Sequence, residues 1–537
     1  MTDDTTAPAL VGEFLTWYFD ALPARAAALG STGHDSTLGD FSASGFTRFE
    51  RDAGRWLDRF AAVDAHGLPL EDSVDRDLVL AVLRGERARA SWPDWRRDPT
   101  TYTSTILTAP LVTFLHRLRP EPELVDSVVA RLAEVPAVLA AAKENLDPDL
   151  AAPKIVRRGA EQARAARGYL TGALPQEVTD DALRVRLAEA GEVAAAAFDD
   201  FTAFLDGFAE RARGDWRMGE ELYSTLLVEH EVLGYGAGEL HERGRAAYAE
   251  LEAEMRSLAG THDWHSVMRE LQADHPPTLE AMRAEYEAET ARAREFLVEH
   301  DLVSFAEGER CLVVPSPVFQ RPVLSVASYL QPAPLSAGRT GHFFVPHTPE
   351  HFTPEQVRQR LATNSRSQLA TIAVHEAYPG HHWHLSWLAA QDRVVRKVFR
   401  TPYFSEGWAL YAEKLLREEG YFTERAQELA HVEARLFRAA RMIVDTALHC
   451  GDMTPEQAEE FMSTKTSLTP GTAVGEVTRY CAWPTQAPSY LTGALEIDRI
   501  RADYLAAGRG TLREFHDVIA GSGALPLGLA RRVALGR

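Results

Sequence analysis

The chain has 537 residues, of which 45% are hydrophobic and 25% are charged, and this composition excludes the disordered, collagen-like and low-complexity classes of protein. Its 57 Lys and Arg residues against 78 Asp and Glu residues give a net charge of −21, which argues against a general binder of nucleic acid. The three cysteines, Cys311, Cys450 and Cys481, are too few for a disulfide framework or a thiolate zinc cluster, and they indicate a reducing, cytoplasmic location.

The N-terminal residues lack the basic region and apolar core of a signal peptide, so we expect no export. No run of about 18 apolar residues occurs, so we expect no membrane-spanning helix. From residue 3 to about residue 300, apolar residues three and four apart predict a succession of amphipathic helices. The clearest predicted helices are Leu124–Asn145, Lys154–Leu170, Asp180–Arg211 and Ala246–Leu258.

The pattern changes between residues 310 and 346, where short runs of β-branched and aromatic residues are bounded by Pro and Gly. The runs are CLVVPSPVF, VLSVASYL and GHFFVP, and they predict a small sheet. Helical periodicity resumes at Thr353 and continues to the C-terminus. We therefore expect a mainly α protein that forms one large domain over residues 1–537, with a helical half at 1–300 and, at 301–537, a half that holds the β insertion and a metal site.

Four of the 19 histidines fall within ten residues, in the segment His375-Glu-Ala-Tyr-Pro-Gly-His-His-Trp-His384. A zinc site needs imidazoles and carboxylates that converge on one point, and the usual H-E-x-x-H spacing is absent here. His375 and His381 are six residues apart, or about 240° around an ideal helix, so a regular helix cannot bring both to one ion. Pro379 and Gly380 lie between them and favour a local bulge that would bring His381 round.

His382 is the alternative second ligand, because it lies seven residues after His375 and near the same face of an uninterrupted helix, about 10.5 Å along its axis. Taken singly, each histidine of the cluster is more often a packing or surface residue than a ligand. The cluster as a whole, with Glu376 beside the first histidine, favours a metal site because acidic residues of suitable spacing follow.

These acidic residues lie in the segment FSEGWALYAE, where Ser405 is a plausible helix N-cap and Glu406 would lie in the first turn. Glu406 and Glu413 are seven residues apart and therefore on one helical face, so one can bind a metal while the other orients a ligand. The competing interpretation is that an acid in the first turn complements the helix dipole without any metal.

Four segments, HEAYPGHH, EGWALYAE, RMIVDTALH and RYCAWPTQAPSY, closely resemble the bacterial domain-of-unknown-function 885 (DUF885) family, a set of candidate zinc peptidases. The resemblance runs nearly from end to end. More distantly, the family is similar to the helical gluzincin peptidases, which include thimet oligopeptidase and angiotensin-converting enzyme. Those enzymes carry H-E-x-G-H and a glutamate ligand about 24–25 residues later. Alignment of their Gly-His pair with Gly380-His381 puts Glu406 on that ligand and favours His381 over His382.

The resemblance implies a large gluzincin-like helical fold in which His375, His381 and Glu406 hold one zinc ion per chain. Glu376 would then be the general base. Gluzincins often stabilise the oxyanion with a tyrosine or histidine from the C-terminal part of the chain, and Tyr490, followed by Tyr480, is the candidate here. Imidazole and carboxylate ligands also suit Mn, Fe, Co and Ni, so the assignment to zinc rests on the resemblance.

Other residues are candidates for roles around this centre. Arg441, Asp445 and His449 follow one another at four-residue spacing and predict one of three things: support of the metal ligands, a clamp for a substrate carboxylate, or a solvated row of charge pairs. The β insertion could provide an edge strand for an extended peptide, formed by SYLQPAP with Tyr329 and by GHFFVP. Gln486 is a candidate substrate-binding residue.

The sequence departs from the family pattern at two places. The family usually has Pro-Gly-Gln where this chain has Pro484-Thr485-Gln486, and the usual Leu-Gln after the paired histidines is replaced by Trp383-His384. Neither change removes a proposed metal ligand, so we expect the metal to be kept and the shape of the substrate pocket to differ.

These features together predict a cytoplasmic zinc hydrolase that cleaves peptide or amide bonds in small peptides or amide conjugates, with no nucleic acid or membrane partner. Two alternatives remain open. One is a metal-dependent biosynthetic lyase or hydrolase of a specialised metabolite, and the other is a non-catalytic peptide-binding scaffold. Structural zinc sites fill four positions with protein ligands, whereas three ligands and a base favour catalysis. The sequence does not determine the oligomeric state.

Overall fold

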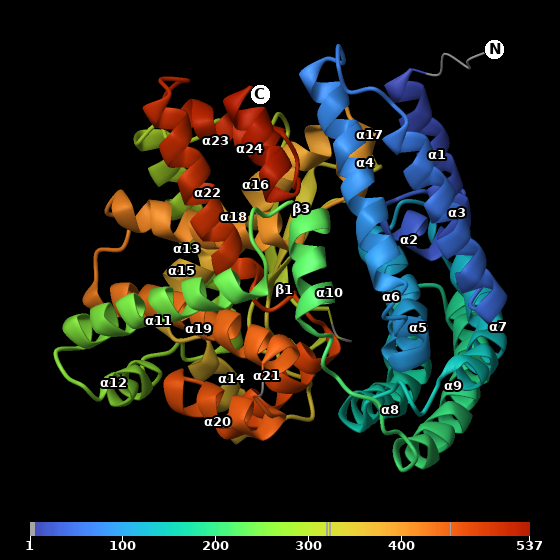
Figure 1. Cartoon of the computed structure of the whole chain (residues 1–537). Coiled ribbons are helices and arrows are strands. Elements are labelled where there is room, and N and C mark those ends of the chain that lie inside the picture. Colours follow the sequence, from blue (N-terminus) through green and yellow to red (C-terminus); the bar gives the residue numbers. More distant parts are fainter. Residues whose placement is uncertain (1–5, 318–319, 322–323, 452, 537) are drawn as a thin grey trace. The chain divides into compact units, whose positions relative to one another are not determined.

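The computed structural model describes the chain except for residues 1–5, 318–319, 322–323, 452 and 537. It confirms a mainly helical protein with one short sheet (Figure 1). The chain divides into two compact units, residues 1–218 with Ala333–Ser336, and Gly219–Pro332 with Ala337–Arg537. The boundary between these two units lies after Met218.

The first unit is built entirely from helices in the part of the chain that the structure describes. They are α1 (Ala7–Ala21), α2 (Pro23–Ala28), α3 (Ala43–Ala61), α4 (Leu70–Arg89), α5 (Asp94–Arg97), α6 (Thr100–His116), α7 (Glu121–Asn145), α8 (Pro153–Arg167), a π-helical turn η1 (Gly168–Ala173), a 3-10 turn η2 (Leu174–Glu177) and α9 (Asp181–Ala209). Three of the four helices singled out from the sequence correspond to α7, α8 and α9.

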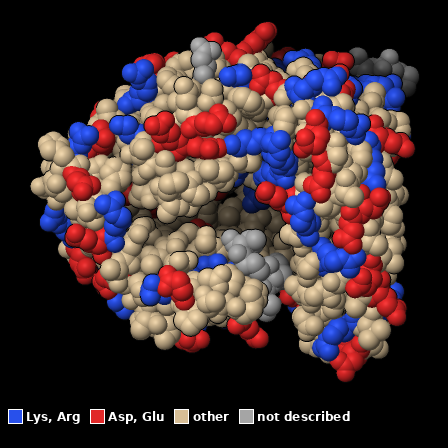
Figure 2. Space-filling model, turned by 90° about the horizontal axis from the view of Figure 1, so that it is seen from below, with Lys and Arg blue, Asp and Glu red and all other residues tan. Residues whose placement is uncertain are grey.

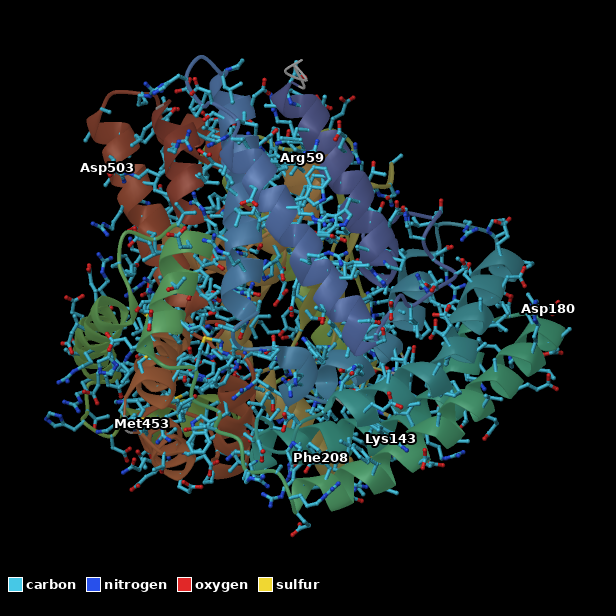
Figure 3. The ribbon with its side chains drawn as sticks, turned by 45° about the vertical axis from the view of Figure 1, so that its right-hand side comes forward. Arg59, Lys143, Asp180, Phe208, Met453 and Asp503 are labelled. Carbon is cyan, nitrogen blue, oxygen red and sulfur yellow. The ribbon has the colours of Figure 1, made fainter. Side chains whose placement is uncertain are left out.

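The long helices α7 and α9 lie side by side and run in the same direction. At their N-terminal ends the backbone N–H of Thr179 donates to Glu121, and at their C-terminal ends Lys143 pairs with Asp200. Figure 3 shows the same arrangement, with Asp180 at one end and Lys143 at the other. Asp180 caps α9 by accepting from two backbone N–H groups of the first turn, as expected for an acid at this position.

The second unit contains the remaining helices and the sheet. The helices are α10 (Glu220–Thr225), the π-helical turn η3 (Leu226–His230), α11 (Ala237–Ala259), α12 (Trp264–Leu271), α13 (Leu279–Glu299), α14 (Pro354–Thr363), α15 (Arg366–Glu376), α16 (His381–Ala390), α17 (Val394–Val398), α18 (Pro402–Glu418), α19 (Arg425–Cys450), α20 (Pro455–Lys465), α21 (Pro470–Ala482), α22 (Ser489–Ala506), α23 (Leu512–Gly521) and α24 (Leu527–Leu535). The predicted helix Ala246–Leu258 is the C-terminal part of α11.

The sheet has three strands in the order β1-β3-β2, formed by β1 (Arg310–Pro315), β2 (Ser328–Leu330) and β3 (Thr340–Val345). Strand β1 pairs with β3 in parallel, and β2 pairs with β3 in the antiparallel sense. The segment GHFFVP therefore does not form an edge, because β3 is the central strand and its backbone groups pair on both sides. The expected strand residues at 318–319 and 323 lie outside the described residues.

Helices α18 and α22 approach each other closely at a pair of glycines. A Cβ atom at Gly407 would lie 2.5 Å from Cα of Gly493, and a Cβ atom at Gly493 would lie 1.9 Å from the carbonyl oxygen of Tyr403. Only glycine allows two helix backbones to pack at this distance. Because Glu406 and Tyr490 flank this crossing, the packing of the two glycines brings those two side chains into one region.

The surface carries charges of both signs. On the face shown in Figure 2, Lys and Arg residues are interspersed with Asp and Glu residues. Among the described residues, no helix combines the length and the apolar character that are needed to cross a bilayer.

Candidate metal centre

The helical conformation is interrupted between α15 and α16, and this interruption positions the second histidine of the cluster, His381. Helix α15 ends at Glu376, Ala377 leaves the helical conformation, and α16 begins at His381. The backbone N–H of Gly380 donates to the carbonyl of Val374 at 3.0 Å, so the chain folds back over the end of α15. A Cβ atom at Gly380 would lie 2.0 Å from the carbonyl oxygen of His375, which explains the glycine. The connection is thus a break between two helices rather than the expected bulge within one.

The structure brings His375, His381 and Glu406 together, and their ligand atoms all lie within 4.8 Å of one another. Glu406 Oε2 is 3.6 Å from Nε2 of His375 and 3.4 Å from Nε2 of His381. Donor atoms about 2.0–2.2 Å from a tetrahedral ion are separated by about 3.3–3.6 Å. The two separations from Glu406 match this spacing, as is required of three residues that would hold one tetrahedral ion such as zinc.

Glu413 orients His375 from behind. The His375 Nδ1–H donates to Glu413 Oε1 at 2.7 Å, which leaves Nε2 free to face the centre. The hydroxyl of Thr371 donates to Glu413 Oε2 at 2.8 Å, and Nδ1 of His431 lies 3.5 Å from the same oxygen. Glu413 was a candidate ligand or support, and its geometry is that of the support, a carboxylate on the outer nitrogen of a metal-binding histidine.

The electrostatics of the cluster favour a bound cation. Burial lowers the pKa of His375, but hydrogen bonds to Glu406 and Glu413 outweigh burial and raise this pKa to about 10. Burial raises the pKa of Glu406, but the charge of His381 and the hydrogen bonds from both histidines outweigh it and hold this pKa well below its usual range. A proton on His375 therefore stabilises the two carboxylates, and a metal ion would replace that proton.

Glu376 has the properties of an available base. It directly follows His375, it is half-buried, and burial raises the pKa of its carboxyl group. No described residue forms a hydrogen bond with its carboxylate, unlike Glu406 and Glu413. A carboxylate that lies beside the candidate metal ligands and has no hydrogen-bond partner is available to accept a proton.

His382 lies beside the centre but turns away from it. The hydroxyl of Tyr329 lies 3.0 Å from Nδ1 of His382, and Nε2 donates to Glu309 Oε2 at 2.6 Å. Glu309 also accepts from the hydroxyl of Tyr378 at 2.6 Å. Both ring nitrogens of His382 are therefore engaged, and the geometry favours His381 as the second ligand.

His384, the last histidine of the cluster, is a packing residue. It is fully buried, neither ring nitrogen has a hydrogen-bond partner, and its ring packs on Phe404 and Trp408. Burial lowers the pKa of His384 to about 3, so its ring is neutral at physiological pH.

The two candidate tyrosines differ in how their hydroxyls are engaged. The Tyr480 hydroxyl donates to Glu476 at 2.7 Å and accepts from Nε of Arg441 at 3.1 Å. The Tyr490 hydroxyl has no hydrogen-bond partner among the described residues. Burial raises the pKa of Tyr490, and the nearby charge of Glu406 raises it further. Tyr490 is therefore the candidate tyrosine whose hydroxyl is free, and the charge of Glu406, a candidate metal ligand, acts on it.

The stripe on α19 is buried, so it does not form the solvated row of charges that was one of the expectations. Arg441 is 7% exposed, Asp445 0% and His449 1%. The hydroxyl of Tyr223 donates to Asp445 at 2.5 Å, and His449 Nε2 donates to the carbonyl of Tyr480 at 3.0 Å. Asp445 and His449 thus connect α19 to its neighbours and are not among the clustered ligand atoms.

The polar groups of the other two expected substrate-binding residues already interact with neighbouring side chains. Gln486 accepts a hydrogen bond from Arg479, and Tyr329 contacts His382. Tyr329 lies on β2, which is an edge strand of the sheet, but this strand spans only Ser328–Leu330.

Sequence reasoning missed several residues that the structure places around the centre. Glu309 lies in the loop before β1, and Thr371 lies inside α15. Neither residue belongs to a sequence motif that would have indicated its role. His431 and Arg438 are seven residues apart in the predicted C-terminal helix, a spacing that places them on one face and was a usable signal.

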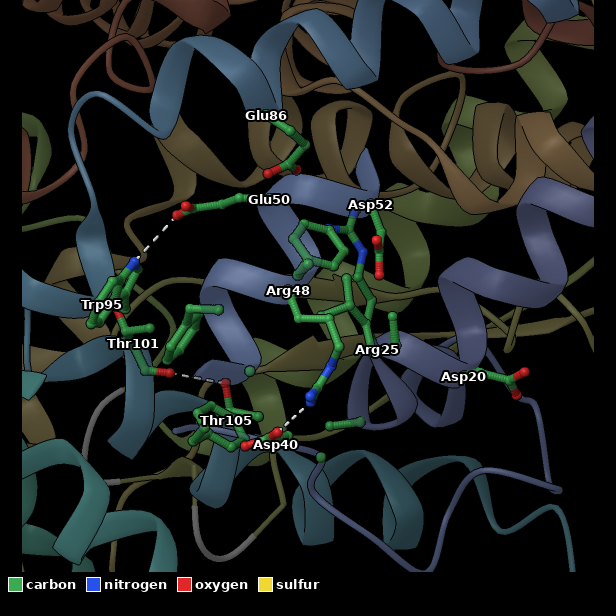
Figure 4. A pocket seen from close by; sticks show the side chains of 18 of the residues that line it. Asp20, Arg25, Asp40, Arg48, Glu50, Asp52, Glu86, Trp95, Thr101 and Thr105 are labelled. Carbon is green, nitrogen blue, oxygen red and sulfur yellow. Dashed lines mark hydrogen bonds and ion pairs between the residues drawn. The ribbon is translucent and has the colours of Figure 1, made fainter. Parts of the chain in front are cut away.

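The first unit contains a separate cavity of about 890 Å³, which is shown in Figure 4. Its lining combines aromatic rings, such as Phe46 stacked on Trp95, with charged residues. Arg48 pairs with Asp40 there at 2.5 Å. None of the residues predicted for the metal site lines this cavity.

The fold and the site define a large helical protein with a three-residue candidate metal centre. The chain belongs to the DUF885 family, described as bacterial proteins of unknown function, whose model matches residues 23–533. No curated protein matches the sequence.

Two solved structures share the fold. One is a candidate lipoprotein of unknown function from Shewanella oneidensis, which is 20% identical with a TM-score of 0.81 over 99% of this chain and 100% of that chain. The other is a candidate lipoprotein from Colwellia psychrerythraea, which is 19% identical with a TM-score of 0.83 over 99% of each chain.

Proposed function

We propose that this protein is a zinc-dependent hydrolase of gluzincin type that cleaves peptide or amide bonds in small peptides or amide conjugates. The spacing of the three donor atoms of His375, His381 and Glu406 is the observation that carries the proposal. Three protein ligands leave a fourth tetrahedral position for water or substrate, which is the arrangement of catalytic rather than structural zinc sites.

A bound zinc ion would acidify a water molecule and polarise the scissile carbonyl group. Glu376 accepts the proton of the attacking water and passes it to the leaving amine, because its carboxylate has no other partner. The Tyr490 hydroxyl donates a hydrogen bond to the oxygen on which negative charge develops. Glu413 keeps the Nδ1 proton on His375, so that Nε2 remains a ligand throughout.

The proposal is tested first by metal content. Elemental mass spectrometry of protein purified without a chelator or a histidine tag should find about one zinc per chain in the wild type. The same measurement should find no zinc in the Glu406→Ala variant. Absence of metal from the wild type after zinc is added back would contradict the proposal.

Turnover on a panel of short peptides and amide conjugates tests the reaction itself. The Glu376→Gln variant should keep its zinc and lose about 10²–10⁴-fold in kcat, which is the usual contribution of a general base. Near-normal turnover in this variant would remove Glu376 from the mechanism. Zinc without turnover of any member of the panel would turn the search towards a specialised metabolite.

A further inference from the structure

A positively charged cluster lies on α19 and α21 and shares a single carboxylate. Arg441 pairs with Glu476 at 2.8 Å, and Arg479 pairs with the same oxygen at 2.9 Å. Arg438 is one turn before Arg441 on α19. Two of the three guanidinium groups therefore share the Glu476 carboxylate, and the Arg438 guanidinium is not paired with it, in a chain whose net charge is −21.

Arg438 is the member of this cluster that forms no direct ion pair, although its charge acts at longer range on Glu413 and Glu433. Its Nη1 donates to the carbonyl of Ala434 at 3.0 Å, and its Nε is buried with no hydrogen-bond partner. No carboxylate among the described residues forms an ion pair with it. A half-buried guanidinium is costly to desolvate, and an anion that entered the site would offset this cost.

The cluster adjoins the metal ligands through Tyr490. The guanidinium of Arg438 lies 5.7 Å from the centre of the Tyr490 ring, and that of Arg441 lies 4.8 Å from it. Tyr490 is one turn before Gly493, and Gly493 packs on Gly407, the residue after Glu406. Both guanidinium groups therefore lie near the ring of Tyr490, and the charge of Glu406 acts on the same tyrosine.

The course of α19 gives the same placement. His431 lies near Glu413, the support of His375, and Arg438 follows His431 by two helical turns on the same face. Helix α19 thus passes near Glu413 at His431 and comes close to the ring of Tyr490 at Arg438. Arg438 and the ring of Tyr490 therefore lie close to each other at this end of the site.

We propose that Arg438, with Arg441 beside it, binds a carboxylate of the substrate next to the bond that is cleaved. This inference rests on the proposed function and narrows its substrate class to peptides or amide conjugates that carry a negative charge near the scissile amide. A carboxylate matches the paired N–H groups of arginine, whereas a neutral amide does not. The carboxylate is either the C-terminus of a peptide or the side chain of Asp or Glu.

Binding is measured without turnover, on the zinc-loaded Glu376→Gln protein, by fluorescence anisotropy of labelled short peptides. One peptide pair differs only in a free or an amidated C-terminus, and a second, amidated pair differs only in one Glu or Gln. The peptide with the carboxylate should bind about 10–100-fold more tightly than its neutral partner, as expected for a charge-assisted hydrogen bond. Preference in the first pair identifies a C-terminus, and preference in the second pair identifies a side chain.

Arg438→Gln in the same background should abolish the preference, and Arg438→Lys should restore part of it. The control is Arg499→Gln, which removes an exposed arginine of the same unit and should leave the preference unchanged. Equal affinities within both pairs, or a preference that survives Arg438→Gln in protein with normal zinc content, would overturn the inference. Wild-type hydrolysis of neutral and charged peptides at equal rates would overturn it too, and would leave the proposed hydrolase standing.

Discussion

The two histidines of the candidate centre differ in what their outer ring nitrogen, Nδ1, contacts. His375 and His381 both direct Nε2 towards Glu406, but only His375 has a carboxylate on its outer nitrogen, since Nδ1 of His381 is buried without a partner. Glu413 in turn is held by Thr371 and lies near His431. The two imidazoles are therefore unequal, and His375 is the candidate ligand whose orientation is fixed without a metal.

This inequality predicts the effect of Glu413→Gln. The amide keeps the shape of the side chain but loses the charge that stabilises His375, so zinc affinity should fall by about 10–100-fold while the fold is retained. Affinity is measured by competition with a chromogenic chelator. The control is Glu418→Gln, an exposed glutamate on the same helix, which should not change zinc affinity. Unchanged affinity in the Glu413 variant would show that this carboxylate serves packing alone.

The extent to which single residues could be predicted depended on local motifs. His375, Glu376, His381 and Glu406 lie in two short segments whose spacing already suggested a zinc site. The difference between His381 and His382 could not be derived from spacing, because it depends on Glu309, which lies far away in the sequence and reaches His382 only in the folded chain.

At the level of elements, the centre depends on the interruption between α15 and α16 and on the close packing of α18 against α22. The helices themselves were largely predictable, because their apolar residues follow the helical period. Their ends were less so: Thr401 and not the expected Ser405 caps α18, so Glu406 lies beyond the first turn of that helix. The break after Glu376 was signalled by Pro379 and Gly380, but its form was not. The order of the strands was also beyond the sequence, because β2 is only three residues long and β3 lies in the centre through a crossover.

Gly380 is the position at which this geometry can be tested. A Cβ atom there would overlap the carbonyl oxygen of His375, so Gly380→Ala should displace α16 from α15, lower stability by about 1–3 kcal/mol and reduce zinc content. Thermal unfolding and elemental analysis measure the two effects. Gly471→Ala on α21 is the control, because a Cβ atom there would meet no atom within 4 Å. Equal behaviour of the two variants would contradict the close packing at Gly380.

At the scale of the whole molecule, the candidate centre belongs to one of the two compact units. Its ligands come from α15, α16 and α18, all of which lie in the second unit. The first unit, with α7 and α9, has no His, Cys, Asp or Glu group of metal-binding geometry among its described residues. A metal ion at the centre would therefore stabilise the second unit directly. It would not stabilise the first unit directly, because none of its candidate ligands lies there.

Removal of the metal should accordingly loosen one part of the chain. A ligand that binds only the folded state at 1,000 times its Kd stabilises that state by about 4.1 kcal/mol, and chelation withdraws this contribution. Hydrogen exchange read by mass spectrometry should become faster in α15, α16 and α18 after chelation, while α7 and α9 keep their protection. The Glu406→Ala variant is the control, since it should exchange at the same rate with and without chelator. Equal acceleration in α7 and α9, or none in α15, would contradict a metal centre that joins these three helices.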